Sequence, residues 1–366
     1  MTCAQFRASM RGEKPVSADH GGSIISLAAR YGKSPEEYID FSSSVNEFID
    51  TGKFQDEFNL NNDDIGRYYP ENDLTDIEEK FAGFNGVYGK NITLGAGLTP
   101  LIYRSLGVWD FSRAVVLYPA FSEYERAIRS RRMGITPIPS CIVRHNPDVL
   151  LSYSYDFLFI ANPDNPTGTL TDKETIGKIA KISLKKNAVV FMDEAFMDFC
   201  DNDNSSSKMI HSYPNLIVGR TLTKITGFPG IRVGYTISST GMAEKLKSGM
   251  ESWPLSQQAI NFARKLDMSY LKESIKDLGA EREYMKQRLE SMGLKIIGTP
   301  AANYISFRCT GKRDDESLPE FLARRNVIIR ELKKYRGLDD LSFRVSIKRR
   351  EKNKILLDAL EEYMVH

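Results

Sequence analysis

Residues 157–193 read FLFIANPDNPTGTLTDKETIGKIAKISLKKNAVVFMD: an apolar run, a turn rich in proline and glycine, a helical pattern and a second apolar run. Ile176 and Ile179 repeat at helical spacing, and Thr171 with Glu174 predicts a capping box at the start of that helix. Strand, helix and strand in this order are typical of a parallel sheet covered by helices. The stretch therefore predicts an α/β fold.

The same alternation extends through the middle of the chain. Short apolar runs predict strands at residues 92–94, 114–118, 157–161, 188–192, 216–219 and 232–238. Beyond about residue 242 the pattern changes to long helices, then to short strands at residues 304–307 and 343–347, and to a terminal helix that carries Ile355, Leu356, Leu360 and Tyr363. We therefore expect a mostly parallel sheet between helices, followed by a smaller α+β lobe.

Length and composition exclude several classes of protein. With 366 residues the chain exceeds the size at which single cores usually stop growing, so two domains are expected. Its 50 lysines and arginines balance 48 aspartates and glutamates, which disfavours a nucleic-acid or membrane-surface role. The scattered cysteines and histidines favour a reduced, cytoplasmic protein without a structural metal. We find neither a signal peptide nor a stretch long and apolar enough to span a membrane.

Residues 220–232 read RTLTKITGFPGIR and place one lysine among hydroxyls and glycines. Lys224 can form an imine with an aldehyde, while Thr221, Thr223 and Arg232 can bind a phosphate through hydroxyls and a bidentate guanidinium. The obvious aldehyde that carries a phosphate is pyridoxal phosphate. For this segment alone, a surface turn with a solvated lysine and arginine is the alternative.

The segment Gly95-Ala96-Gly97-Leu98-Thr99 follows a predicted strand. It can turn tightly into a helix and direct backbone N–H groups and a hydroxyl at a phosphate. Pro100 stands at the third glycine position of the dinucleotide fingerprint, which disfavours a nucleotide-binding enzyme without pyridoxal. A plain strand-to-helix turn explains the segment equally well.

Three other strand ends carry side chains that suit a heteroaromatic cofactor, because functional residues of a parallel sheet gather at the carboxyl ends of its strands. Phe121 can stack on a ring, and the amide of Asn165 can point into a site from a turn that prolines restrain. Asp193 places a carboxylate at the end of an apolar strand, which is costly unless a cation such as a protonated pyridine nitrogen lies opposite. The alternatives are a core phenylalanine, a structural turn and a helix cap or ion pair.

Three motifs in order carry a resemblance to a known family: Asn-Pro-x-Asn-Pro-Thr-Gly from Asn162, Asp-Glu-Ala from Asp193, and Lys224 with an arginine eight residues later. With them the chain resembles, over nearly its whole length, the fold-type I, aspartate-aminotransferase-like pyridoxal-phosphate enzymes. Within that family it resembles the branch of histidinol-phosphate aminotransferases and threonine-phosphate decarboxylases. The segments His20-Gly21-Gly22-Ser23, Asp40-Phe41-Ser42 and Asp193-Glu194-Ala195-Phe196 are similar to the decarboxylases.

The resemblance implies a pyridoxal-phosphate-dependent transferase-like fold. It comprises a large domain, with a mostly parallel seven-stranded sheet between helices, and a smaller α+β domain. The implied ranges are residues 1–50 for an N-terminal arm that joins the small domain, 51–262 for the large cofactor-binding domain and 263–366 for the small C-terminal domain. A homodimer is also implied.

The resemblance also implies roles for the cofactor site. Lys224 would bind the cofactor and shuttle protons, Asp193 would hold the pyridine nitrogen, Asn165 would donate to the phenolic oxygen and Phe121 would stack on the ring. The implied phosphate-binding residues are Ala96, Gly97, Thr221, Thr223 and Arg232, with Tyr69 from the second subunit.

For the substrate, the resemblance implies that Arg344 binds the α-carboxylate and that Arg330 also contacts the substrate. The full implied set is His20, Gly21, Ser44, Asn165, Arg330 and Arg344. Ser44 departs from the decarboxylase pattern, which has asparagine there, and Trp253-Pro254-Leu255-Ser256 mixes features of both branches. Surface ion pairing is the alternative for both arginines.

The implied substrate is a small phosphorylated amino acid or amine. We expect a threonine-phosphate decarboxylase-like enzyme, with a histidinol-phosphate aminotransferase-like enzyme as the alternative. A catalytically silent binding protein of the same fold is a third possibility, which the intact Lys224, Asp193 and Asn165 disfavour.

Overall fold

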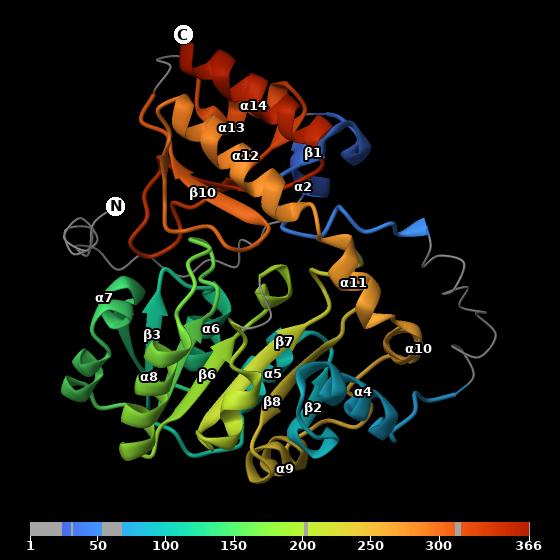
Figure 1. The fold of residues 1–366 in the computed structure, drawn as a ribbon, viewed down its shortest axis with the longest axis vertical. Helices are drawn as coiled ribbons and strands as arrows, with labels where there is room; N and C mark the ends of the chain where they lie inside the picture. The colour runs from blue at the N-terminus through green and yellow to red at the C-terminus, as the bar shows by residue number, and fades with distance from the viewer. Residues whose placement is uncertain (1–23, 31, 53–67, 201–203, 312–315, 366) are drawn as a thin grey trace.

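A seven-stranded sheet is the centre of the computed structural model, which describes residues 24–30, 32–52, 68–200, 204–311 and 316–365 (Figure 1). Its strands, in spatial order, are β2 (Ile92–Gly95), β8 (Gly234–Ser238), β7 (Leu216–Thr221), β6 (Val189–Asp193), β5 (Phe157–Ala161), β3 (Arg113–Tyr118) and β4 (Gly134–Pro139). Strand β8 runs antiparallel to both of its neighbours, and the other ladders are parallel. The predicted mostly parallel α/β sheet is confirmed.

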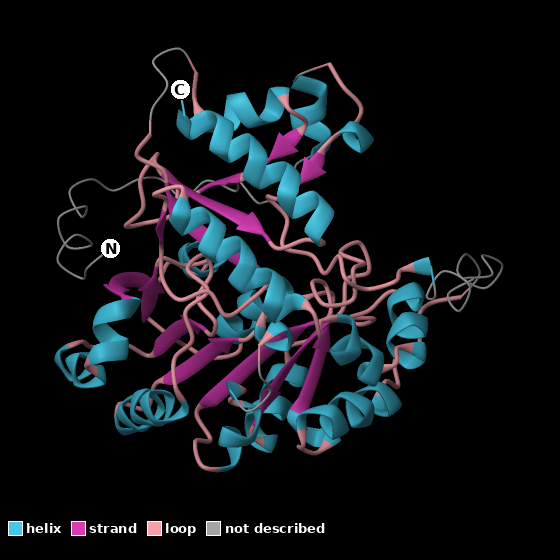
Figure 2. Cartoon of the chain, turned by 45° about the horizontal axis from the view of Figure 1, so that its top comes forward, coloured by secondary structure: helices cyan, strands magenta, loops and turns pink. Residues whose placement is uncertain are grey.

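Helices cover both faces of this sheet because the central strands are apolar on both sides (Figure 2). In β5, Phe157 and Phe159 point into one apolar cluster, while Leu158 and Ile160 point into another. The helices of this part of the chain are α4 (Thr75–Asn85), α5 (Leu98–Gly107), α6 (Ser122–Ser130), α7 (Ser140–His145), α8 (Lys173–Lys185), α9 (Thr240–Ser248), α10 (Gln257–Lys265) and α11 (Met268–Ser274). Helices α5 and α6 contribute to the first cluster, and α4 and α8 to the second.

A second, antiparallel sheet lies above the carboxyl edge of the first (Figure 1). It contains β12 (Arg330–Glu331), β13 (Ser342–Ser346), β10 (Tyr304–Arg308) and β9 (Lys295–Ile296), accompanied by α12 (Leu278–Ser291), α13 (Leu318–Arg324) and α14 (Arg350–Val365). The early segment joins this part, because β1 (Ile39–Asp40) pairs in parallel with β11 (Val327–Ile328), and α2 (Ile24–Arg30) lies beside them. No helix in the described ranges has the length and apolar character needed to cross a membrane.

The structure corrects two local predictions and adds a strand to the large sheet. Asp172, not Thr171, caps α8, because its carboxylate accepts a hydrogen bond from Thr175 N at 2.8 Å while Thr171 N is held by Asn162 Oδ1. Strand β8 begins at Gly234, two residues later than predicted. The sequence also missed β4, which contains Pro137 and Pro139; the strand tolerates these prolines because it lies at the sheet edge.

Candidate active site

A pocket of about 420 Å³ lies at the carboxyl edge of the large sheet, and residues of both sheets line it. Strand ends bring the residues of the large sheet together here because parallel strands finish at one edge. The predicted residues that line it are Ser44, Phe121, Asn165, Asp193, Thr221, Thr223, Lys224, Arg232, Arg330 and Arg344.

Lys224 lies in the turn that follows β7. Its backbone carbonyl accepts a hydrogen bond from Asn46 N at 2.8 Å, which ties the turn to the early segment of the chain. Burial, together with the positive charges of Arg344 and Arg232, lowers the pKa of Lys224 to about 8. An amine that is easily deprotonated can attack an aldehyde and can also exchange a proton.

Asp193 is the last residue of β6 and is 7% exposed. Its Oδ2 accepts a hydrogen bond from the Tyr124 hydroxyl at 2.5 Å, and its Oδ1 accepts one from Ala195 N at 2.9 Å. Burial raises the pKa of Asp193, the nearby charge of Glu194 raises it further, and both hydrogen bonds act in the opposite direction. The carboxylate lacks an ion-pair partner among the described residues, so a cation in the pocket would stabilise its charged form.

Four of the predicted phosphate-binding residues meet around Arg232, and three of them, Thr221, Thr223 and Arg232, line the pocket. Gly97 has φ 82°, and a Cβ at this position would collide with the guanidinium of Arg232. Arg232 Nη1 donates to Thr223 Oγ1 at 3.3 Å, and the hydroxyls of Thr221 and Thr223 are 2.8 Å apart. This cradle of a bare backbone, two hydroxyls and a guanidinium suits a phosphate.

Asn165 and Arg344 meet across the pocket although 179 residues separate them. Arg344 Nη1 donates to Asn165 Oδ1 at 2.6 Å, which leaves the amide Nδ2 as a donor on the other side. Arg344 Nη2 donates to Ser42 O at 3.1 Å. Arg344 Nε and the hydroxyl of Ser44 are buried without a hydrogen-bond partner in the part of the chain that the structure describes, so both can bind a ligand.

Arg330 stands directly opposite Arg344 in the antiparallel pair of β12 and β13. Residues opposite each other in such a pair project from the same face, with Cα atoms about 4.5–5.5 Å apart. Burial lowers the pKa of Arg344, and the charge of Arg330 lowers it further. Two guanidinium groups on one wall create an attractive site for anions.

Three further predicted residues, Ala96, Gly97 and Tyr69, are not part of the pocket lining. A Cβ on Gly97 would nevertheless meet Arg232. Tyr69 is 77% exposed and stacks on Trp253, with ring centroids 4.4 Å apart. His20 and Gly21 lie outside the described residues.

A model of the family described as aminotransferase class I and II matches residues 37–360. The chain belongs to this family. Class I and II aminotransferases depend on pyridoxal 5'-phosphate, so this chain is a pyridoxal-phosphate-dependent aminotransferase or decarboxylase. Its large sheet, small antiparallel sheet and connecting helices are the aspartate-aminotransferase-like fold.

Individual relatives of this aminotransferase-family chain fall into two groups. A threonine-phosphate decarboxylase of Salmonella typhimurium is 28% identical over 353 residues, which is 94% of this chain and 96% of the relative. Histidinol-phosphate aminotransferase 2 of Archaeoglobus fulgidus is 29% identical over 334 residues, 89% of this chain and 93% of the relative. The crystal structure of the histidinol-phosphate aminotransferase from Clostridium acetobutylicum is similar, with a TM-score of 0.81 and 26% identity over 89% of this chain and 98% of that chain.

The residues present in the pocket fit the family's cofactor. Asp193 has no cationic partner among the residues that the structure describes, Lys224 has a lowered pKa, and the cradle at Arg232 suits a phosphate. Phe121 begins the turn into α6 and offers a ring beside the pocket. Together these observations match an aldehyde, a pyridine nitrogen and a phosphate on one molecule.

Sequence reasoning missed several residues of the pocket. Tyr124 donates a hydrogen bond to Asp193 and lies three residues after Phe121. This helical spacing would have placed Tyr124 on the same side as Phe121 and could have identified it. Glu123 and Arg126 line the same side and form an ion pair at 2.5 Å. Tyr335 lies between β12 and β13 in a segment without a motif, and no sequence signal identified it.

Proposed function

We propose that this enzyme decarboxylates a small phosphorylated amino acid, such as threonine phosphate. The observation that supports the proposal is the side-by-side pair of Arg330 and Arg344 on one wall of the pocket. A phosphorylated amino acid carries a carboxylate and a phosphate on neighbouring carbons, so its two anionic groups can meet two adjacent guanidinium groups. Histidinol phosphate has no carboxylate and would leave one arginine without an anion.

The proposed roles follow from the position of each side chain. Asp193 holds the ring nitrogen of the cofactor, Asn165 donates from Nδ2 to its phenolic oxygen, and Phe121 stacks on its ring. The cradle of Ala96, Gly97, Thr221, Thr223 and Arg232 holds the phosphate. When bound, the cofactor supplies an electron sink for the electron pair left at Cα.

Arg344 and Arg330 select the reaction by orienting the substrate. In decarboxylation the bond from Cα to the carboxylate carbon breaks, carbon dioxide leaves, and Cα must receive a proton. Lys224 is placed to deliver it, since its lowered pKa makes proton exchange easy near neutral pH. Ser44, whose buried hydroxyl has no hydrogen-bond partner among the described residues, offers one further donor to the substrate. His20 and Gly21 are proposed to reach the substrate phosphate from the early segment.

Histidinol-phosphate aminotransferase activity is the second candidate. It is supported by the Archaeoglobus fulgidus relative, whose 29% identity is close to that of the decarboxylase. In this reaction Lys224 would remove a proton from Cα instead of supplying one.

A pair of assays on the purified, cofactor-loaded enzyme distinguishes the two activities. Threonine phosphate is supplied in one, and release of carbon dioxide is measured. Histidinol phosphate with 2-oxoglutarate is supplied in the other, and formation of glutamate is measured. Carbon dioxide release without glutamate formation is expected; glutamate formation alone would establish the aminotransferase instead.

We also propose a homodimer in which Tyr69 reaches the cofactor phosphate of the second subunit. Its support is that Tyr69 is 77% exposed and stacks on Trp253, outside the pocket of its own chain. Sedimentation at micromolar concentration should show a dimer, and a fully active monomer would contradict this proposal.

The division into an arm of residues 1–50 and domains of 51–262 and 263–366 is likewise proposed, with α10 running across the second limit.

A further inference from the structure

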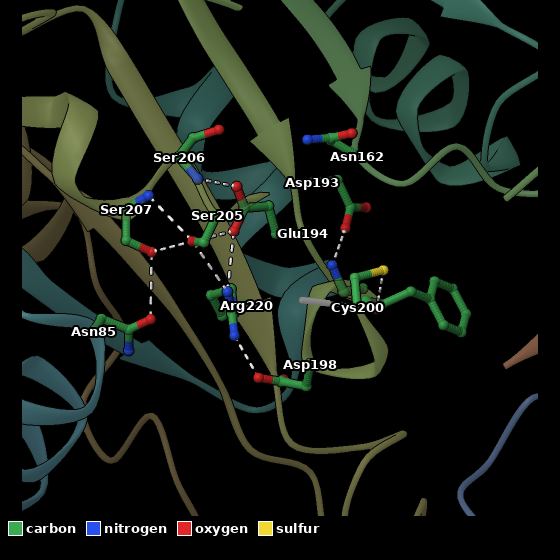
Figure 3. Close-up of polar contacts among 12 residues, drawn as sticks. Asn85, Asn162, Asp193, Glu194, Asp198, Cys200, Ser205, Ser206, Ser207 and Arg220 are labelled. Carbon is green, nitrogen blue, oxygen red and sulfur yellow. Dashed lines mark hydrogen bonds and ion pairs between the residues drawn. The ribbon is translucent and has the colours of Figure 1, made fainter. Parts of the chain in front are cut away.

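A buried ion-pair cluster lies behind the ends of β6 and β7 (Figure 3). Arg220 is 1% exposed, its Nη1 donates to Glu194 Oε2 at 3.0 Å, and its Nη2 pairs with Asp198 of the short helix Met197–Phe199. Side chains alternate along a strand, so Arg220 and Glu194 point away from the pocket that their neighbours Thr221 and Asp193 line. The ion pair therefore lies directly behind Thr221 and Asp193, two residues of the proposed cofactor site.

Both carboxylate oxygens of Glu194 accept hydrogen bonds. Its Oε1 accepts a hydrogen bond from Ser206 N at 2.6 Å, and its Oε2 accepts one from the Ser205 hydroxyl at 2.7 Å in addition to Arg220. Its backbone N donates to Gly219 O at 2.8 Å, which extends the ladder of β6 and β7 by one residue. The position of Asp193, one residue earlier, is thereby coupled to this cluster.

The cluster extends into the adjoining elements. Arg220 is the register partner of Tyr235 in β8, and the Tyr235 hydroxyl accepts a hydrogen bond from Asn85 of α4 at 3.0 Å. Asn85 Oδ1 also accepts a hydrogen bond from the Ser207 hydroxyl at 3.3 Å. Strands β6, β7 and β8, helix α4 and residues 205–207 are thus joined around one guanidinium.

The charge of the cluster acts on Asp193. The groups that act on this carboxyl are the Tyr124 hydroxyl of α6, which donates a hydrogen bond to it, and the charge of Glu194 behind the strand end, with Lys224 in the same pocket. Glu194 opposes the ionisation of Asp193, and Arg220 is the cation that neutralises Glu194. A buried ion pair seldom stabilises a fold more than apolar packing would, so stability alone gives little reason for one here.

We propose that Arg220 is a positioning residue for the cofactor, which acts through Glu194 to keep Asp193 ionised and aimed at the ring nitrogen. The inference rests on the role of Asp193 in the proposed function, and it does not depend on which reaction the enzyme catalyses.

The test measures cofactor binding by the apoenzyme. Apoprotein is titrated with pyridoxal 5'-phosphate and the dissociation constant is read from the visible absorbance. Arg220→Met leaves Glu194 as an unneutralised carboxylate beside Asp193, so the dissociation constant should rise roughly tenfold to a hundredfold. Glu194→Gln removes the charge that opposes the ionisation of Asp193. Its dissociation constant for the cofactor should therefore stay within about threefold of that of the parent protein, even though the fold loses stability.

Combining the two substitutions gives the sharpest result. If Arg220 acts by neutralising Glu194, Arg220→Met with Glu194→Gln should bind the cofactor at least about fivefold better than Arg220→Met alone. If Arg220 only packs the core, the second substitution should add to the damage. A double variant no better than Arg220→Met overturns the proposal.

Asn215→Ala is the matched control. Asn215 is buried at the opposite end of the same strand pair, where its Nδ2 donates to Ala180 O at 3.1 Å and to Ala188 O at 3.0 Å. The substitution Asn215→Ala should lower the unfolding temperature without changing the dissociation constant. A loss of affinity equal to that of Arg220→Met would overturn the proposal. If Arg220→Met fails to fold, Arg220→Lys is tested in its place. Because this variant keeps the positive charge, its affinity for the cofactor should stay within about threefold of that of the parent protein, and a larger loss would contradict the proposal.

One further variant separates this inference from the proposed role of Asp193. Asp193→Asn should weaken binding at least as much as Arg220→Met. If Asp193→Asn binds the cofactor normally, the role of Asp193 fails. If it binds weakly while Arg220→Met binds normally, only the inference about Arg220 fails.

Discussion

The two walls of the pocket are built in different ways. Asp193, Thr221, Lys224 and Arg232 lie within forty residues of one another, and three of them stand at or just after the end of a strand of the large sheet. The opposite wall combines Arg330 and Arg344 with the backbone of Ser42, which is 302 residues from Arg344. The difference teaches that the first wall, which carries the residues proposed to bind the cofactor and is here called the cofactor wall, is encoded locally. The second wall, which carries the residues proposed to bind the substrate and is here called the substrate wall, exists only through the register of the small sheet and the return of the early segment.

The largest expected effect belongs to the cofactor wall. Lys224→Ala should lower kcat by at least about a thousandfold, because in the proposed function this one residue both binds the cofactor and moves the proton. The parent protein should be yellow, and borohydride should remove its visible band by reducing the imine. The variant should still bind the cofactor through Asp193 and Arg232. Full activity in Lys224→Ala would end the assignment of this wall.

The same lysine should impose a stability penalty on the apoprotein. The pKa of Lys224 falls from 10.5 to about 8, so between these values the unfolded chain binds more protons than the folded one. The free energy of unfolding should therefore rise with pH across this window, by about 3 kcal/mol in total. Apo Lys224→Met should lack that rise and be more stable than the parent by a similar amount at pH 7. Urea titrations at pH 7 and pH 10.5 measure this, and equal pH dependence in both proteins would contradict it.

On the substrate wall, Arg330→Ala should weaken the use of phosphorylated substrates specifically. Losing a charge-assisted contact costs about 1.5–3 kcal/mol, or roughly tenfold to a hundredfold in kcat/KM. The loss should appear mainly in KM and should be much smaller for unphosphorylated threonine or histidinol. Arg308→Ala is the matched control, since Arg308 of the same small sheet pairs with Asp339 but does not line the pocket. Equal effects on both kinds of substrate would make Arg330 a structural residue.

The smallest expected effect is that of Tyr124→Phe, again on the cofactor wall. Tyr124→Phe removes a hydrogen bond that lowers the pKa of Asp193, so this pKa should rise further above its usual value. Cofactor affinity should fall about fivefold, or ~1 kcal/mol, and the loss should grow as the pH decreases because Asp193 then becomes protonated. Tyr155→Phe removes a buried hydrogen bond to Ser183 and serves as the control. A loss of affinity that does not depend on pH would show that Tyr124 only packs the site.

The accuracy of the sequence predictions followed the range of the interactions involved. Strand β5 was predicted to the residue, because an apolar run between turns needs no other part of the chain to define it. The cap of α8 was misplaced by one residue, because Asn162 binds the backbone of Thr171 and leaves Asp172 to cap the helix. Ile355 was assigned to the terminal helix correctly, yet it is 46% exposed.

By itself the sequence determined the fold class and indicated the residues proposed to hold the cofactor, since Lys224, Asp193 and Asn165 stand in short motifs whose geometry follows from a strand and the turn after it. Only the tertiary structure decided which buried charges meet. The hydrogen bond of Tyr124 to Asp193, the pairing of Arg330 with Arg344 and the burial of Arg220 against Glu194 join segments that are separate in the chain. The physical reason is that a charge is tolerated inside a protein only where the fold supplies its partner, and that partner is seldom a neighbour in sequence.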